Sequence, residues 1–157
     1  MFLRIDDRFI HGQVGVTWIS YVGAGEILLA NDKLVKDSLA CTMQKLSAPT
    51  VKVTIKSVSE AIEYIKTLSK EKLNKLFVIV SCPQDALTLV EAGLDIRHIN
   101  IGHTAHKDES VEIHPCLFVG PKELESFQKL EDKGIDLDFR LVPDHRKPEI
   151  KFNKIQI

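Results

Sequence analysis

The residues best suited to chemistry are gathered in one short segment near the N-terminus, residues 4–14 (RIDDRFIHGQV). The segment contains two arginines, the carboxylates of Asp6 and Asp7, and the imidazole of His11. An imidazole has an unperturbed pKa of about 6.5, so it keeps a free ring nitrogen at cellular pH and can attack a phosphorus atom. The segment therefore predicts a site that takes up a phosphoryl group on His11.

A phosphoryl group on His11 needs positive charge and hydrogen-bond donors around it. The Arg8 guanidinium can supply two parallel N–H donors. The backbone N–H groups of Gly12 and Gln13 can supply more, because they lie where a helix is expected to begin. Gly12 also permits close approach, since it has no Cβ. We therefore predict Arg8, Gly12 and Gln13 as phosphate-binding residues.

One of the two neighbouring aspartates can accept a hydrogen bond from the other ring nitrogen of His11 and so fix its tautomer. Successive residues of an extended chain point to opposite sides, so Asp6 and Asp7 cannot both enter one pocket. We favour Asp7 as the carboxylate at the site and Asp6 as a brace for the loop. The residue types alone also allow His11 to be an ordinary helix-start residue beside a salt bridge.

Other polar residues are expected at the same edge of the fold. Asn31 and Asp32 follow an apolar run, where they can cap the next helix or line the pocket. His103 opens a polar loop and is a further pocket candidate. The histidines of residues 98–114 are of a type that binds zinc, but no C-x-x-C or H-E-x-x-H spacing accompanies them, so no metal is predicted.

Short apolar runs typical of strands alternate with helical patterns along the whole chain. We expect strands near residues 2–5, 26–30, 51–55, 76–81, 98–102, 116–119 and 137–142, and helices near 13–22, 35–46, from 57–59 onward, 83–92 and 121–133. This alternation predicts an α/β fold, a single doubly wound domain over residues 1–157 with a mostly parallel sheet and helices on both faces. Ligands of such folds bind beyond the carboxyl ends of the strands, where strand order reverses, and His11 follows the first strand.

Composition limits the classes of partner. The chain has 157 residues, of which 44% are hydrophobic and 27% charged, as in an ordinary globular domain. A net charge of −1 and scattered aromatic residues do not favour a nucleic-acid partner. Apolar runs are far shorter than the roughly 20 residues of a membrane span, and the charged N-terminal segment is unlike a signal peptide. We therefore expect a cytoplasmic chain with no membrane insertion.

The sequence lacks the motifs with which proteins bind their own phosphate donor. Neither G-x-x-x-x-G-K-[ST] nor G-x-G-x-x-G is present. We expect no cofactor, and a phosphoryl group that arrives on a partner protein.

Residues 4–14, with Trp18, closely resemble the active-site segment of the enzyme IIB component of the sugar phosphotransferase system (PTS), mannose–fructose–sorbose family. The likeness covers essentially the whole chain and continues at Ala30-Asn31-Asp32, Ala48-Pro49, Asp85-Ala86-Leu87, Ile99-Asn100-Ile101-Gly102 and Val142-Pro143.

The resemblance implies a phosphocarrier, a protein-N(π)-phosphohistidine–sugar phosphotransferase. The residue that matches His11 would accept a phosphoryl group from the phosphohistidine of the IIA component. It would then pass the group to a sugar held by the membrane components IIC and IID, with which the chain would associate peripherally. The arginine that matches Arg8 would steady the phosphate. An alternative is a non-catalytic PTS-like domain that regulates or docks a partner.

The chain departs from the family pattern in one loop. Where the family commonly has Asn-Met-Gly after Ile101-Gly102, this chain has His103-Thr104-Ala105-His106, whose role stays open. Residues 15–18 and 23–24 resemble the N-acetylgalactosamine/galactosamine branch to some extent, although the transported sugar does not follow from this.

Overall fold

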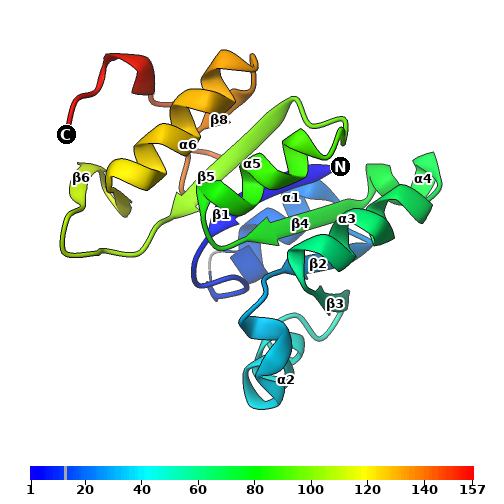
Figure 1. Cartoon of the computed structure of the whole chain (residues 1–157). Helices are drawn as coiled ribbons and strands as arrows, with labels where there is room; N and C mark the ends of the chain where they lie inside the picture. The colour runs from blue at the N-terminus through cyan, green and yellow to red at the C-terminus, as the bar shows by residue number, and fades with distance from the viewer. Residues whose placement is uncertain (13) are drawn as a thin grey trace.

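A six-stranded parallel sheet forms the centre of the molecule (Figure 1). The computed structural model describes residues 1–12 and 14–157, and of Val16 the backbone only. The strands are β1 (Phe2–Asp6), β2 (Glu26–Ala30), β3 (Lys52–Lys56), β4 (Leu76–Val80), β5 (His98–His103) and β8 (Asp136–Asp138). Their order is β3-β2-β4-β1-β5-β8, and every neighbouring pair is parallel. This confirms the predicted α/β fold class.

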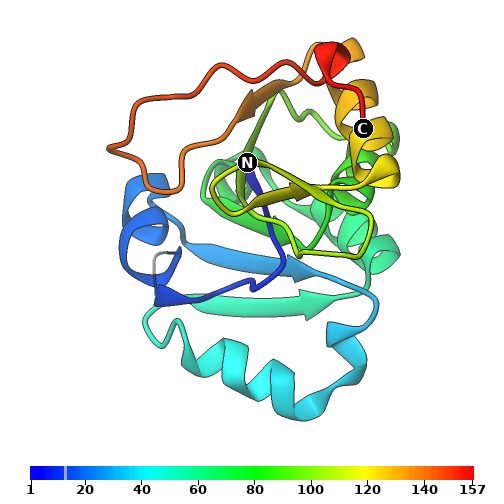
Figure 2. The same cartoon turned by 90° about the vertical axis from the view of Figure 1, so that its left-hand side faces the viewer.

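Helices cover both faces of the sheet, which lies between them in Figure 2. One face carries the π-helical turn η1 (Val14–Trp18), α1 (Ile19–Val22), the 3₁₀ turn η2 (Leu34–Lys36) and α2 (Ser38–Leu46). The other carries α3 (Val58–Thr67), α4 (Lys70–Asn74), α5 (Pro83–Glu91) and α6 (Pro121–Asp132). The strand β1 is thus followed by helices on one face, whereas its neighbours β4 and β5 lead to elements on the other. This is the reversal point at which doubly wound folds bind ligands.

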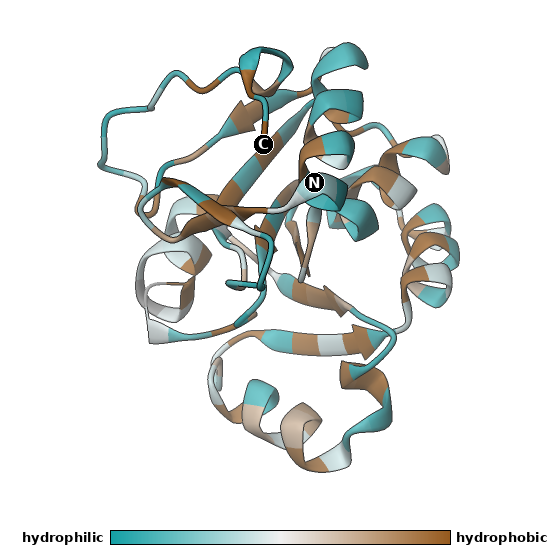
Figure 3. Ribbon diagram, turned by 60° about the vertical axis from the view of Figure 1, so that its left-hand side comes forward, coloured by the Kyte–Doolittle hydropathy of each residue, from teal (hydrophilic) through white to brown (hydrophobic). Residues whose placement is uncertain are grey.

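The alternation of side chains along each strand divides the interior into two cores. In β1, Leu3 and Ile5 belong to the core beneath α3, α5 and α6, whereas Phe2 packs against the core around Trp18. The polar side chain of Arg4 follows Phe2 and lies against Trp18. All five residues of β4 are buried, as expected for a strand covered on both faces. Hydrophobic residues accordingly concentrate in the strands and on the inner sides of the helices (Figure 3).

Local sequence signals explain where several helices begin. Ser57 and Glu60 form a capping box at the start of α3. Pro83 and Pro121 stand in the first turns of α5 and α6, where a missing N–H costs nothing. The helix expected over residues 35–46 is interrupted because Asp37 caps α2, accepting a hydrogen bond from the Ala40 N–H at 2.9 Å.

Three expected elements are present but differ in form, pairing or length. The helix expected over residues 13–22 is the π-helical turn η1 followed by the short α1. The strand expected near 116–119 pairs in an antiparallel hairpin, β6 (Val111–His114) with β7 (Leu117–Val119), outside the main sheet. The last strand spans Asp136–Asp138 rather than 137–142.

The C-terminal tail has a polar sequence but packs against the domain through a buried aromatic residue. Phe152, in the 3₁₀ turn η3 (Phe152–Lys154), is fully buried and stacks on Phe127 with 4.3 Å between ring centroids. Glu131 accepts the backbone N–H groups of Phe152 and Asn153, each at 3.0 Å. The tail is therefore held against α6 by the stacking of Phe152 on Phe127 and by the Glu131 hydrogen bonds.

Candidate active site

The loop of residues 7–12 joins the carboxyl end of β1 to η1 and carries the predicted site. Phe9 has a φ of 56°, a left-handed conformation that is costly for a bulky residue and is often found at functional loops. The Phe9 N–H donates to the Asp6 carbonyl oxygen at 3.1 Å, and the Ile10 N–H donates to Gln44 Oε1 on α2 at 2.8 Å. Ile10 itself is buried. The backbone that presents His11 is therefore held from both sides.

His11 lies against the carboxylate of Asp6. Its Nε2 is 2.9 Å from Asp6 Oδ2, and the imidazole keeps about 20% of its surface exposed. The Asp6 side chain is fully buried. Burial opposes ionisation of Asp6, but hydrogen bonds from His11 and Arg4 outweigh it and hold the pKa of this carboxyl below its ordinary value. An ionised carboxylate only accepts, so in the neutral imidazole His11 Nε2 donates and Nδ1 keeps the free electron pair.

The assignment of Asp7 to this role is wrong. Asp7 Oδ1 contacts His103 Nδ1 at the end of β5, and the Asp7 N–H donates to the His103 carbonyl oxygen at 3.3 Å. Asp6 is the last residue of β1 and its carboxylate meets Arg4 and His11, so the next residue along the chain points elsewhere. His103, the residue that departs from the family pattern, thereby ties the ends of β1 and β5 together.

A second arginine, which the sequence reasoning did not select, lies behind Asp6. Arg4 is fully buried and donates to Asp6 Oδ2 through Nε at 3.2 Å and through Nη2 at 2.8 Å. Its guanidinium carbon lies 5.2 Å from the centroid of the Trp18 ring. Arg4 also donates through Nη1 to Asn100 Oδ1 on β5. The sequence signal for this contact was a polar residue between apolar residues in each strand, Arg4 in β1 and Asn100 in β5.

Arg8 lies at the surface of the site, with 47% of its side chain exposed. Its backbone N–H donates to Asp6 Oδ1 at 3.2 Å, and its Nε is 3.8 Å from the same oxygen. The Arg8 guanidinium therefore approaches the same Asp6 carboxylate that contacts His11, but it is not enclosed. Gly12 is exposed with open space where a Cβ would stand. Gln13, the other predicted donor, lies outside the described residues.

A cavity of about 380 Å³ adjoins the site at the N-terminal ends of α5 and α6. Its lining consists of Asp7, Asn31, Asp32, Lys33, Ser81, Cys82, Pro83, Asp85, Thr104, Ala105, Lys107 and Glu123. Asn31 and Asp32 fill both roles that the sequence left open. Asn31 Oδ1 accepts the Leu34 N–H at 2.7 Å at the start of η2, Asp32 Oδ1 accepts the Val58 N–H at 2.9 Å, and both line the cavity.

The carboxylates in this cavity differ in charge environment. Burial and the nearby charge of Asp32 raise the pKa of Asp85, whose hydrogen-bond partners Ser81 and Cys82 carry no positive charge. Burial also acts on Glu123, but its ion pair with Lys107 holds the pKa of Glu123 below its ordinary value. Burial raises the pKa of the Cys82 thiol, which keeps it protonated and unreactive at neutral pH.

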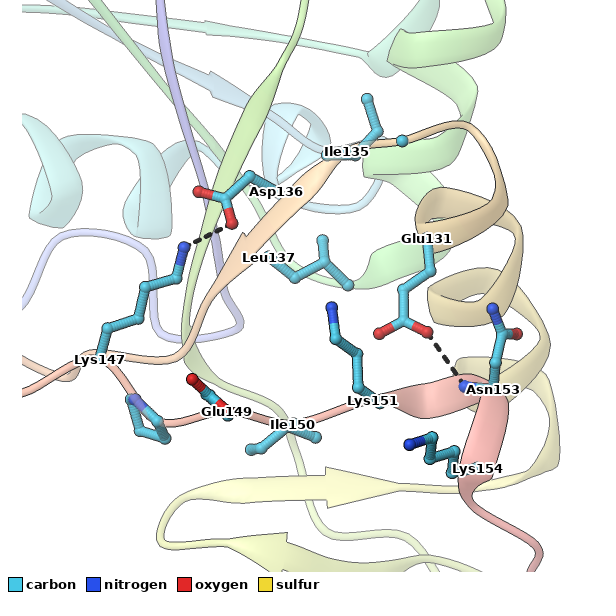
Figure 4. Close-up of a pocket in the computed structure, with 12 residues that line it drawn as sticks. Glu131, Ile135, Asp136, Leu137, Lys147, Glu149, Ile150, Lys151, Asn153 and Lys154 are labelled. Atoms are coloured by element: carbon cyan, nitrogen blue, oxygen red, sulfur yellow. Dashed lines mark hydrogen bonds and ion pairs between the residues drawn. The ribbon is translucent and has the colours of Figure 1, made fainter.

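A larger hollow of about 840 Å³ lies between β8, the end of α6 and residues 147–154 (Figure 4). Lys147 pairs with Asp136 across it, and Glu131 binds the Asn153 backbone. It opens at the first residue of β8, which is the amino edge of a parallel sheet. It is therefore remote from the edge that carries His11.

Residues 1–12 and 14–157 contain neither a cluster of metal ligands nor a membrane-spanning helix. That part of the chain holds no group of three or more histidine, cysteine, aspartate or glutamate side chains arranged to bind a metal ion. It also contains no helix that is both long and apolar enough to cross a membrane.

A comparison with protein-family models matches residues 1–155 to the family "PTS system sorbose subfamily IIB component". The chain belongs to this IIB family. Among curated relatives of this IIB chain, the N-acetylgalactosamine-specific phosphotransferase enzyme IIB component 1 of Escherichia coli is 28% identical, covering 96% of this chain and 95% of the relative. The sorbose-specific EIIB component of Klebsiella pneumoniae is 31% identical over 88% of this chain and 85% of the relative.

Solved structures agree with the family assignment. The crystal structure of the Escherichia coli N-acetylgalactosamine-specific IIB component 1 superposes on this IIB chain with a TM-score of 0.89 at 26% identity, covering 96% of this chain and 98% of that one. The IIB domain of the Klebsiella pneumoniae sorbose permease gives 0.85 at 29% identity, covering 94% and 93%. The resemblance inferred from residues 4–14 is thereby confirmed, and the chain is a PTS IIB component of the sorbose/mannose type.

Proposed function

We propose that this IIB chain carries a phosphoryl group on His11, accepting it from a phosphohistidine of a IIA component and passing it to a sugar held by membrane components IIC and IID. The observation that carries the proposal is the contact of His11 Nε2 with the buried carboxylate of Asp6. It occupies one ring nitrogen and leaves the other, Nδ1, with a free electron pair on a half-exposed loop.

The first transfer follows from this arrangement. The Nδ1 electron pair attacks phosphorus, a new P–N bond forms, and the bond to the donor histidine breaks with its electron pair returning to the donor nitrogen. The His11 ring becomes cationic because it keeps the proton on Nε2. Asp6, ionised and 2.9 Å away, stabilises that cation. In this proposal, Arg8 and the Gly12 N–H bind the phosphoryl oxygens.

The second transfer depends on the same Asp6–His11 pair, and in this step the P–N bond breaks. A sugar hydroxyl attacks phosphorus, the P–N bond breaks, and the electron pair returns to Nδ1. A cationic ring is the better leaving group, so the proton that Asp6 retains on Nε2 favours release to the sugar. The hydroxyl proton goes to a base of the acceptor complex. We place the chain in the cytoplasm, where it associates peripherally with the membrane components.

Sugar specificity belongs to the acceptor complex in this proposal. Relatives of the chain carry names specific for N-acetylgalactosamine, sorbose and fructose. A mannose-specific relative from Escherichia coli is named EIIAB, and this chain covers 43% of it. That name joins an A and a B component in one protein, which supports a IIA partner for this chain.

Labelling tests the proposal directly. The chain should acquire a base-stable, acid-labile phosphoryl group from phosphoenolpyruvate in the presence of the general PTS proteins and the cognate IIA component. His11→Ala should remain unlabelled, with His103→Ala as the matched control that keeps its label. Membranes with IIC and IID should then remove the label as sugar phosphate. Label on the His11→Ala variant would overturn the assignment, and label that no sugar removes would favour a regulatory domain.

A further inference from the structure

We propose that Arg4 is a positioning residue for phosphoryl transfer. Arg4 is held by a hydrogen bond to Asn100 and occupies space that is left because Gly102 has no side chain. In this position it fixes the Asp6 carboxylate and thereby decides which nitrogen of His11 is protonated. The idea rests on the function proposed for His11, but its first readout requires no phosphoryl transfer.

Asn100 has only one orientation that satisfies its neighbours. Its Nδ2 donates to the backbone carbonyl oxygens of Asp138 at 3.1 Å and Arg140 at 3.0 Å, which uses both N–H groups of the amide. Its Oδ1 is left to accept from Arg4 Nη1. A flipped amide would set donors against the guanidinium and an oxygen against two carbonyls. Asn100 is thus a fixed acceptor that holds one side of the Arg4 guanidinium.

The guanidinium is fixed on its other sides as well. Nε and Nη2 both donate to Asp6 Oδ2, so the planar group cannot rotate without losing contacts at both ends. Gly102 leaves the room that it occupies. A Cβ at residue 102 would lie 1.8 Å from Arg4 Nη2 and 2.6 Å from Asp6 Oδ2. The Arg4 contacts and the absence of a side chain at 102 therefore depend on each other.

These contacts determine the hydrogen bonds of Asp6. Its Oδ2 receives the two N–H groups of Arg4 and faces His11 Nε2, while its Oδ1 receives the Arg8 N–H. A carboxylate surrounded by donors stays an acceptor, so the proton between Asp6 and His11 belongs to Nε2. Without the Arg4 fork the carboxyl group is free to turn or to bind a proton itself. It could then donate to Nε2, which would place the imidazole proton on Nδ1 and block the nucleophile.

The first experiment measures the His11 tautomer in the unphosphorylated protein by long-range ¹H–¹⁵N NMR of the imidazole ring. The wild type should show the Nε2–H tautomer. Asn100→Ala, which leaves Arg4 and Asp6 in place, should shift the tautomer ratio at least tenfold toward Nδ1–H, and Arg4→Lys should shift it further. If Arg4→Lys fails to fold, Asn100→Ala carries the test.

Thr54→Val is the matched control. It removes the hydrogen bond from Thr54 to Glu26 at 2.5 Å, in the β2–β3 pair away from His11, and should leave the tautomer unchanged. A purely structural role for Arg4 predicts that all three variants lose stability and none changes the tautomer. That result would overturn the proposal.

The second readout is the position of the phosphoryl group. The wild type should form the Nδ1 adduct, and Asn100→Ala should form it at least tenfold more slowly and give a detectable Nε2 adduct by ³¹P and ¹⁵N NMR. Equal rates and an unchanged isomer in folded Asn100→Ala would count against the positioning role. If wild-type His11 accepts no phosphoryl group at all, the proposed function fails, while the tautomer result still decides the role of Arg4.

Discussion

Two acidic regions lie at the same edge of the sheet and differ in the charges around their carboxylates. Around His11, the Asp6 carboxylate meets the Arg4 guanidinium and its pKa is held below the ordinary value. In the neighbouring cavity, Asp85 meets Ser81 and Cys82, and its pKa is raised. Burial opposes ionisation in both places, so the positively charged partner decides the outcome. Asp6 is therefore kept ionised beside His11, whereas the hydrogen-bond partners of Asp85 carry no positive charge.

The largest expected effect comes from exchanging the Asp6 carboxylate for an amide. Asp6→Asn leaves Arg4 buried without its counter-charge, so we expect a loss of about 3–5 kcal/mol in the free energy of unfolding. Phosphorylation of His11 should slow by about 10- to 100-fold, because the group that orients the ring is altered. Urea unfolding and labelling rates measure the two effects. Asp85→Asn is the matched variant, and equal losses from both would remove the distinction between the regions.

Arg8→Lys separates phosphate binding from folding. Lysine keeps the charge but loses the planar fork, so we expect phosphoryl transfer to His11 to slow about tenfold. The exposed position of Arg8 makes its ion pair with Asp6 weak, and the free energy of unfolding should change by less than about 1 kcal/mol. Rapid-quench labelling beside urea unfolding provides the measurement. An unchanged transfer rate would mean that Arg8 does not bind the phosphoryl group.

Asp7→Asn tests the two adjacent aspartates against each other. The change weakens the contact with His103 but leaves Asp6 and His11 paired. We expect transfer to slow by only about threefold, a few tenths of the effect of Asp6→Asn on a logarithmic scale. The labelling assay that compares the two variants side by side decides this. A loss as large as that of Asp6→Asn would return Asp7 to the catalytic role.

The smallest effect should be a pH dependence that belongs to Asp85. The pKa of Asp85 is raised in the folded chain, so the folded state binds this proton more tightly than the unfolded state does. The contribution of Asp85 to the free energy of unfolding therefore falls as the pH rises above about 4. Asp85→Asn removes this titration, so the stability of the variant relative to wild type should increase from pH 4 to pH 7. Urea unfolding at both pH values tests this. If the stability of the variant relative to wild type decreases from pH 4 to pH 7, the predicted direction is wrong.

Much of the fold followed from local patterns. The strand expected near residues 76–81 and the helices expected to begin at residues 57–59 and 83 are present, because the signals for them act within a few residues. The hairpin of β6 and β7 was missed because its pairing depends on a partner strand rather than on periodicity. Phe152 was missed for a similar reason, since only the aromatic rings of other elements make its burial favourable.

The sequence by itself determined that His11 stands beside arginine and aspartate beyond a first strand, because those residues are neighbours in the chain. Only the tertiary structure decided that Asp6 rather than Asp7 meets His11, since that choice depends on which side of β1 faces Trp18. It alone revealed Arg4 and Asn100 as partners, because they are 96 residues apart and meet only when β1 and β5 pair. Chain neighbours supply the chemical groups of the site, and the pairing of distant strands fixes their orientation and charge.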